Sequence, residues 1–402
     1  MSTSFSSASQ EAGPSTRSAA VERGFHRFVV ELRGQELLVV GKPGVWSWDA
    51  VSPGTAALLE LPRFEPGLNV LDLGCGTGVM GAIAALSAPD GHAILVDVNL
   101  AAVACARRTL AANGVTNARV RLADGVEGLE GASFDLVVCH LPRGRDVQRE
   151  LIRGVAHVLA PGGRFYLVAS TRVGVKGAIA CAHDLFGRCG VVRQKKGYHV
   201  AMTVRPEGME APPLIDTYVS RTLTLDGVET TLVSKPGVFA WDRLDEGTAR
   251  LVDAIEVDAG DRVLDLGCGT GLVGLAAARR APRGAVVLVD TDLRAVRSAR
   301  RTLKANGFGH ADVLLSDGVS RVVGESPFDV VVTNPPFHQG REVDYAVTQQ
   351  LVRDAQGVLR PGGRLFLVAN RFIGYDDLIR QSFGNVDTAY VDSSYRVLTA
   401  TA

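Results

Sequence analysis

The sequence predicts two tandem α/β domains, each built on a doubly wound, mostly parallel sheet with a Rossmann-like arrangement. Its 402 residues suggest about two domains, at roughly 100–200 residues per domain. The run VLDLGCGTG at 70–78 recurs at 263–271, which is 193 residues later. Each copy also alternates continuous Val/Leu runs with helix-like segments, a pattern typical of parallel strands buried on both faces.

The second copy shows the expected elements most clearly. We expect a hairpin at 221–233, with Asp226-Gly227 at its turn. Further strands are expected at 262–267, 285–290, 311–317, 328–334 and 363–370, and helices at 271–280, 293–307 and 343–359.

Shorter repeats support duplication of a whole domain rather than a solenoid. Lys42-Pro43-Gly44-Val45 recurs as Lys235-Pro236-Gly237-Val238, and Asp124-Gly125 recurs as Asp317-Gly318. The predicted organisation is a disordered tail at 1–20, a first domain at 21–205, a Pro-rich linker at 206–216 and a second domain at 217–402.

Composition limits the possible classes of protein. Hydrophobic residues make up 46% and charged residues 21%, which is near the average for soluble globular proteins. No apolar run approaches the ~18–20 residues that a membrane span needs. Six cysteines without a CxxC pair argue against zinc and disulfides, so we expect no metal, no membrane partner and a cytoplasmic location.

A glycine-rich loop in the second copy predicts a cofactor site. Gly267, Gly269 and Gly271 follow a strand and open a helix, where the backbone can approach a ligand closely. Asp290 ends the next strand, where a carboxylate would accept hydrogen bonds from ribose hydroxyls. These features also fit a dinucleotide. Asp265 favours a ligand with an ammonium group and a sulfonium centre, because it would repel a pyrophosphate.

Asn334-Pro335-Pro336-Phe337 follows the strand FDVVVT. Together with the run 265–271, Asp290 and the Ser-Asp-Gly at 316–318, it resembles class I S-adenosylmethionine-dependent methyltransferases that act on planar nitrogens. Two such domains in tandem, with the segments 234–248 and 367–379, resemble the bacterial ribosomal RNA (guanine-N2-)-methyltransferases of the RsmC/RlmG type. The resemblance covers residues 21–402 and is stronger in the second copy.

The resemblance implies S-adenosylmethionine as cofactor and a second-domain catalytic site. The implied cofactor-binding residues are Asp265, Gly267, Gly269, Gly271, Asp290, Asp317 and Asn334. The Asn334 side-chain oxygen and the Pro335 carbonyl would accept both N–H protons of guanine N2, and Phe337 would stack on the base. We expect a small-subunit rRNA guanine as the target. Large-subunit rRNA guanine, adenine N6 or a protein glutamine remain alternatives, as does a non-enzymatic ribosome assembly factor.

The first copy departs from the second at the catalytic loop. Alignment of 134–138 with 328–332 places His140 at Asn334, Leu141 at Pro335 and Arg143 at Phe337, so the first domain should not methylate an amine by this route. A possible second cofactor set nevertheless persists, at Asp72, Gly74, Gly76, Gly78, Asp97 and Asp124. The first domain of the family usually looks degenerate here, so the loop either binds cofactor without reaction or serves as scaffolding.

Positive charge accumulates in the first copy. Residues 143–205 hold twelve basic and three acidic side chains. The residues predicted to contact RNA phosphates are Arg143, Arg145, Arg149, Arg153, Lys195 and Lys196. An ordinary solvated face is the alternative. The expected partner is ribosomal RNA or the small ribosomal subunit, bound by a monomer.

Overall fold

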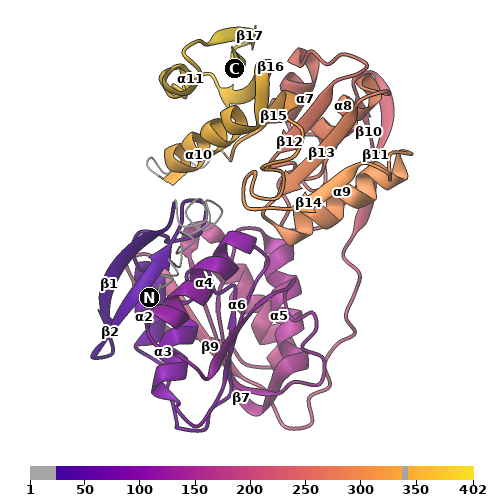
Figure 1. The fold of residues 1–402 in the computed structure, drawn as a ribbon. Coiled ribbons are helices and arrows are strands. Elements are labelled where there is room, and N and C mark those ends of the chain that lie inside the picture. The colour runs from indigo at the N-terminus through magenta and orange to yellow at the C-terminus, as the bar shows by residue number, and fades with distance from the viewer. Residues whose placement is uncertain (1–23, 337–342) are drawn as a thin grey trace, which may run out of the picture.

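The computed structural model describes residues 24–336 and 343–402, and it shows two similar halves (Figure 1). Each half contains a seven-stranded sheet flanked by helices, with strand order β5-β4-β3-β6-β7-β9-β8 in the first and β14-β13-β12-β15-β16-β18-β17 in the second. The predicted fold class is confirmed. The tail predicted at 1–20 lies outside the described residues.

In the first half, helices cover both faces of the sheet. Helices α2, α3 and α4 pack with the β1-β2 hairpin on one face, and α5 and α6 cover the other. The elements are β1 (His26–Leu32), β2 (Gln35–Gly41), α2 (Pro53–Leu59), β3 (Val70–Leu73), α3 (Val79–Ser87), β4 (Ala93–Asp97), α4 (Leu100–Ala112), β5 (Ala118–Leu122), β6 (Phe134–His140), α5 (Arg145–Val158), β7 (Leu159–Ser170), α6 (Val175–Phe186), β8 (Gly190–Lys195) and β9 (Tyr198–Val204).

The second half repeats this layering. Helices α7, α8 and α9 pack with the β10-β11 hairpin, and α11 and α10 cover the opposite face. The elements are β10 (Val219–Leu225), β11 (Val228–Ser234), α7 (Glu246–Ala254), β12 (Arg262–Leu266), α8 (Leu272–Arg280), β13 (Ala285–Asp290), α9 (Leu293–Ala305), β14 (Asp312–Leu315), β15 (Phe328–Thr333), α10 (Val343–Val358), β16 (Leu359–Asn370), α11 (Asp376–Phe383), β17 (Asp387–Val391) and β18 (Tyr395–Thr401).

Sheet topology fixes where a site can form. Strand β12 pairs in parallel with β13 on one side and β15 on the other, and β3 pairs likewise with β4 and β6. The chain order reverses at β12 and β3, and ligands of open α/β sheets bind beyond the carboxyl ends of strands at such a switch point.

The strands and helices expected in the second copy are all present, with small shifts at their ends. Strand β16 begins at Leu359 rather than at residue 363, and its pairing with β15 shifts register between Phe328 and Val330. Helices α7 and α11 and strands β17 and β18 were not predicted. Strand β17 is mostly exposed, so its sequence lacks the apolar run by which the buried strands were found.

The two halves meet through a pair of equivalent backbone hydrogen bonds. The N–H of Leu100 donates to the carbonyl of Thr291 at 2.9 Å, and the N–H of Leu293 donates to the carbonyl of Val98 at 3.0 Å. Leu100 and Leu293 are 193 residues apart, the offset of the repeat. The halves are therefore related by an approximate two-fold axis that passes close to this contact.

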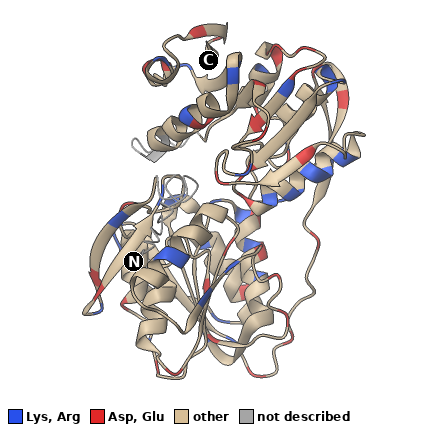
Figure 2. Cartoon of the chain, in the orientation of Figure 1, with Lys and Arg blue, Asp and Glu red and all other residues tan. Residues whose placement is uncertain are grey.

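Reciprocal ion pairs extend the interface. Lys42 of the first half lies 2.5 Å from Asp317 of the second, and Lys235 of the second half lies 2.7 Å from Asp124 of the first. Asp124 also pairs with Arg294 of α9, which is 4% exposed. Figure 2 shows basic residues recurring along α9, whose N-terminal end lies against the first half.

Burial alone would raise the pKa of Asp124, but Arg294 and Lys235 outweigh it and hold that pKa below its usual range. A carboxylate with a lowered pKa stabilises the folded protein at neutral pH, and this contribution is lost as pH falls through the lowered pKa. Asp124 is thus a charge on which the pairing of the halves depends.

Removal of the Asp124 carboxylate should destabilise the protein strongly. Asp124→Ala leaves the buried Arg294 without its carboxylate and Lys235 with Glu150 alone, and a broken buried pair typically costs roughly 3–5 kcal/mol. We expect a clearly lowered Tm at pH 7 in calorimetry.

The matched control is Glu127→Ala, which removes an ion pair with Arg297 across the same interface. Both partners are about a third or more exposed, so its loss should change stability by less than about 1 kcal/mol. Equal effects of the two substitutions would contradict the role assigned to Asp124.

Candidate active site

The glycine loop of the second half begins where β12 ends. Gly267, Gly269 and Gly271 adopt φ values of 79°, 52° and 81°, in the left-handed region that favours glycine. A Cβ at Gly271 would lie 2.9 Å from the Cβ of Ala299 in α9, so this glycine lets helix and loop pack. A Cβ at Gly267 or Gly269 would meet no atom within 4 Å, which leaves room for a ligand.

Asp290 holds this loop from the end of β13. Its carboxylate oxygens accept hydrogen bonds from the N–H of Gly269 and the N–H of Asp292, both at 2.9 Å. Asp290 also lines a cavity of about 360 Å³. Burial raises the pKa of Asp290, although these backbone donors oppose the shift. The carboxylate faces the cavity with its position fixed by two donors.

Asp265, on β12, is the second carboxylate at this cavity, and it is 2% exposed. It accepts a hydrogen bond from the N–H of Gly274 at 2.8 Å. Burial raises the pKa of Asp265 to about 7, the Gly274 N–H opposes this, and the charge on Asp290 adds to it. A cationic ligand would favour the ionised form of Asp265 and lower its pKa.

Asn334 follows β15 and lines the same cavity. Its amide Nδ2 donates to Oγ1 of Thr248 at 3.0 Å and to Oδ2 of Asp245 at 3.4 Å, at the N-terminus of α7. These two acceptors fix which way the amide points. Its oxygen Oδ1 is buried and has no hydrogen-bond partner in the described part of the chain. A buried, unsatisfied acceptor is costly, so it marks a place where a donor from a ligand would fit.

Asp245 and Thr248 were missed as functional residues by the sequence reasoning. Their run at 245–248 was used only for the family resemblance. The sequence shows only that Thr55 recurs as Thr248 at the 193-residue offset, and the contact of each threonine with the side chain at the end of its strand becomes visible in the structure.

Asp317 has a different neighbour from the one expected for a residue at the cofactor. Its carboxylate accepts a hydrogen bond from Lys42, whereas the flanking Ser316 and Gly318 line the cavity. Contact of Asp317 with a cofactor stays a prediction. Pro335 lines the cavity with Asn334, and Phe337 lies outside the described residues.

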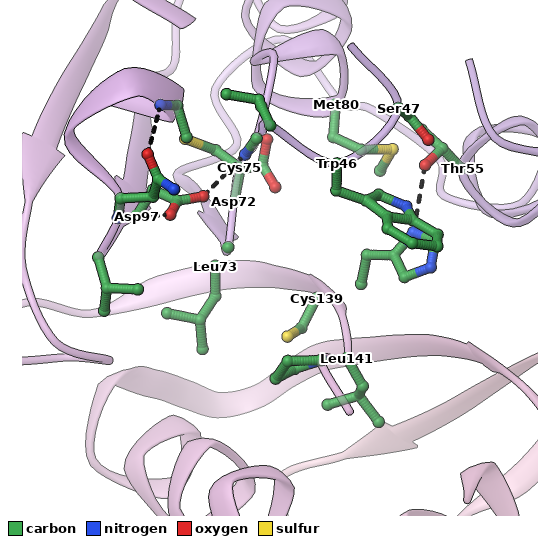
Figure 3. Close-up of a pocket in the computed structure, with 18 of the residues that line it drawn as sticks. Trp46, Ser47, Thr55, Asp72, Leu73, Cys75, Met80, Asp97, Cys139 and Leu141 are labelled. Carbon is green, nitrogen blue, oxygen red and sulfur yellow. Dashed lines mark hydrogen bonds between the residues drawn. The ribbon is translucent and has the colours of Figure 1, made fainter. Parts of the chain in front are cut away.

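The first half forms an equivalent and larger cavity, of about 650 Å³ (Figure 3). It is lined by Asp72, Gly74, Gly76 and Asp97, four of the six residues that the sequence predicted as a second cofactor set. Gly78 and Asp124 are absent from this lining, and Asp124 belongs to the interface between the halves.

His140 occupies the Asn334 position in this cavity. Its Nδ1 lies 3.3 Å from Oγ1 of Thr55, and its ring makes edge contacts with Trp46 and Tyr198. Burial lowers the pKa of His140 to about 4, so the ring is neutral at pH 7. An aromatic ring therefore replaces the acceptor amide of the second half.

The predicted RNA-binding residues fall into two groups. Arg143 lies at the first-half cavity, and Arg145, Arg149 and Arg153 follow at intervals of four along α5, all exposed. Lys195 of β8 pairs instead with Glu60, just after α2, at 2.9 Å. Because α2 and α5 cover opposite faces of the sheet, the six residues do not form one cluster. Lys196 is the exposed neighbour of Lys195.

Among the described residues, no group of three or more His, Cys, Asp or Glu side chains has an arrangement that could hold a metal ion. No described helix combines the length and the apolar character that crossing a membrane requires.

Comparison with known proteins identifies relatives of both halves. The methyltransferase small domain family matches residues 36–202 and again residues 229–399. Ribosomal RNA small subunit methyltransferase C of Pseudomonas entomophila is 35% identical over 274 residues, covering 68% of this chain and 81% of that protein. The protein of the same name from Hahella chejuensis is 36% identical over 270 residues, covering 67% and 78%.

A solved structure extends the match to almost the whole chain. The T. thermophilus 16S rRNA N2 methyltransferase RsmC, in complex with AdoMet and guanosine, aligns with a TM-score of 0.80 and 33% identity. The alignment covers 94% of this chain and 98% of that one. The chain therefore belongs to the family of ribosomal RNA small subunit methyltransferase C, a two-domain class I methyltransferase family.

Proposed function

We propose that this protein transfers a methyl group from S-adenosylmethionine to the exocyclic N2 of a guanine in 16S ribosomal RNA. The second half would catalyse the transfer and the first half would dock the RNA. The observation that carries the proposal is the unpartnered Oδ1 of Asn334 in the cavity wall. The names of the relatives favour the small subunit over the large one.

The cavity of the second half fits the cofactor. S-adenosylmethionine supplies a methyl group that is already activated by its sulfonium charge. Asp290 would accept hydrogen bonds from the ribose hydroxyls, and the open space at Gly267 and Gly269 would admit the amino-acid part. Asp265, once ionised, would balance the positive charge of the ligand.

The guanine amine needs help because its lone pair is delocalised into the ring. If Oδ1 of Asn334 and the carbonyl of Pro335 accept its two N–H protons, the lone pair is left free to face the methyl group. A carbonyl oxygen cannot donate to these acceptors, so the same pair would reject it. The stacking role of Phe337 stays a prediction. No strong general base is required, because the product amine can release its extra proton to solvent.

The alternatives lose support at the same residue. A ribosome assembly factor that only binds the cofactor has no need for an acceptor held beside it by Asp245 and Thr248. Adenine N6 and protein glutamine would use the same acceptors, but the relatives that align with both halves are named for rRNA. We further propose a cytoplasmic location, where ribosomal subunits assemble.

The first half would bind RNA through α5. Arg143 and the stripe of Arg145, Arg149 and Arg153 present four exposed guanidinium groups, suited to contacts with successive phosphates. Of these four arginines, only Arg149 forms an ion pair with a carboxylate of the described residues, with Asp146 at 4.0 Å. Lys195 forms an ion pair with Glu60, so we propose that it contributes less to RNA binding than the arginines.

Loss of the Asn334 amide should abolish most turnover. Asn334→Ala removes one of the two acceptors for the amine, and loss of one such aligned group typically costs about 10²–10³ in kcat. Cofactor affinity, measured by isothermal titration calorimetry, should stay within a few-fold because Asp290 and the glycine loop remain. Undiminished methylation of unmodified small subunits by this variant would refute the role of Asn334.

Cofactor affinity should rise with pH through about 7. At pH 6 Asp265 is mostly protonated, and a cationic ligand must displace that proton, whereas at pH 8 it is ionised. Asp265→Asn should weaken binding at pH 8 and flatten the pH dependence in calorimetry. The remaining slope would report Asp290 and Asp292, whose pKa values burial also raises.

The same substitution should stabilise the ligand-free protein at high pH. A carboxyl with a raised pKa contributes stability below its unfolded pKa and loses it as pH rises through 7. The Tm gain of Asp265→Asn should thus be larger at pH 8 than at pH 5. Equal weakening of cofactor binding by Asp265→Asn at pH 6 and at pH 8 would contradict the raised pKa of Asp265 on which both predictions depend.

Neutral substitution of Arg143, Arg145 and Arg149 with Gln should weaken rRNA binding. Loss of up to three phosphate contacts should lower the slope of log K against log salt by up to about 2–3. The matched control is Gln at Arg107, Arg119 and Arg121, exposed residues at the β5 edge of the same half. An equal loss in both triple variants would move the RNA surface away from α5.

A further inference from the structure

The first-half cavity has no part in the proposed methylation, yet it keeps the architecture of the catalytic one. Gly74, Gly76 and Gly78 have φ values of 78°, 53° and 80°, each within one degree of its second-half counterpart. A Cβ at Gly78 would lie 2.9 Å from Ala106, just as one at Gly271 would meet Ala299. The loop therefore follows the same path in both halves.

The carboxylates are also kept with their partners. Asp97 accepts hydrogen bonds from the N–H groups of Gly76 and Asn99, both at 2.9 Å, and Asp72 accepts one from Gly81 at 2.8 Å. The corresponding bonds of Asp290 and Asp265 have the same lengths. A buried Asp72 beside the half-buried Asp97 is costly, and burial raises the pKa of Asp72 to about 7.

Scaffolding alone does not account for these acids. A neutral side chain could accept the Gly81 hydrogen bond without the desolvation of a charge. The acids instead line a cavity of about 650 Å³ together with Trp46 and Met80, as Figure 3 shows. Such a combination of buried anions and apolar walls suits a cation with a ring system.

The first-half cavity differs from the second-half cavity at the position of Asn334. His140 takes the place of the acceptor amide and already contacts Thr55, Trp46 and Tyr198. The adjacent Cys139 is buried, and burial raises the pKa of its thiol far above neutral pH, so it is not a nucleophile. A ligand held here would find no partner for methyl transfer.

The second half also contributes to this cavity. Gly237, Asp292 and Arg294 line it, while Gly44 of the first half lines the catalytic cavity in return. The N–H of Asp292 is the donor that fixes Asp290 in the catalytic site. An occupant of the first cavity would therefore contact both halves, including Asp292, the residue whose N–H donates to Asp290 in the second site.

We propose that the first half binds a second S-adenosyl ligand, S-adenosylmethionine or S-adenosylhomocysteine, in a site that does not react and that is completed by residues of the second half. The proposal rests on the proposed cofactor of the catalytic half, because the two loops share one geometry. Its occupant would strengthen the pairing of the halves.

Stoichiometry tests this proposal on the full chain. Isothermal titration calorimetry with S-adenosylhomocysteine, and separately with S-adenosylmethionine, should give two sites for the wild type. Asp97→Asn and Asp290→Asn should each leave one site, and the double variant should leave none. Asn keeps one oxygen acceptor, for the N–H of Gly76 or Gly269, and loses the acceptor for the N–H of Asn99 or Asp292, so both variants should retain the loop at some cost in stability.

A second measurement keeps the test independent of how these variants fold. Trp46 is 60% exposed at the first cavity, and its counterpart in the second half is Phe239. Ligand binding should change Trp fluorescence in the wild type and in Asp290→Asn. Trp46→Phe, which copies the second half, should keep two sites in calorimetry and lose most of that change.

The outcomes separate this inference from the proposed function. One site that Asp290→Asn abolishes and Asp97→Asn leaves intact would overturn the inference while methylation stands. No binding in either half would overturn both. Two sites with the fluorescence change would support the second site whichever nucleotide is methylated.

Discussion

The structure depends on reciprocal ion pairs between its two halves. Each copy places the lysine of its Lys-Pro-Gly-Val motif against the Asp-Gly motif of the other copy, at Lys42–Asp317 and Lys235–Asp124. Lys235 and Asp124 are buried, so separation of the halves would leave charges without partners inside a dehydrated surface. The same motifs carry Gly44 and Gly237 into the cavity of the opposite half. Neither cavity is complete in one domain alone.

This constraint explains how a duplicated fold can support an unequal division of work. The interface needs both copies to keep their strands, their glycine loops and their ion pairs. The side chain of Asn334 just after β15, or of His140 at the end of β6, is free of that demand, because it faces the cavity rather than the partner half. Asn334 occupies one such position and His140 the other, so one half keeps an amide acceptor and the other a neutral ring.

The proposed chemistry follows from the support given to one amide. Asp245 and Thr248 at the start of α7 accept hydrogen bonds from the amide nitrogen of Asn334. The amide oxygen is therefore left as an acceptor in the cavity wall. In the proposed function the first half adds a row of exposed arginines on α5, whereas the equivalent helix α10 of the second half carries one arginine, Arg353. In this proposal the second half would bind the target base and the first half would bind the phosphate backbone of the same RNA.

The sequence by itself determined the duplication and the fold class and singled out Asn334 as a candidate site residue, because strand periodicity, glycine spacing and a 193-residue offset are properties of the chain alone. Only the tertiary structure decided which groups meet across long separations. Lys42 and Asp317 are 275 residues apart, Asn334 and Thr248 are 86 apart, and no local pattern encodes either contact. The predicted RNA-binding residues are separated for the same reason. Lys195 on β8 pairs with Glu60 next to α2, on the face of the sheet opposite to α5. Charges close in sequence can be separated by a sheet, and motifs far apart can share one buried pair.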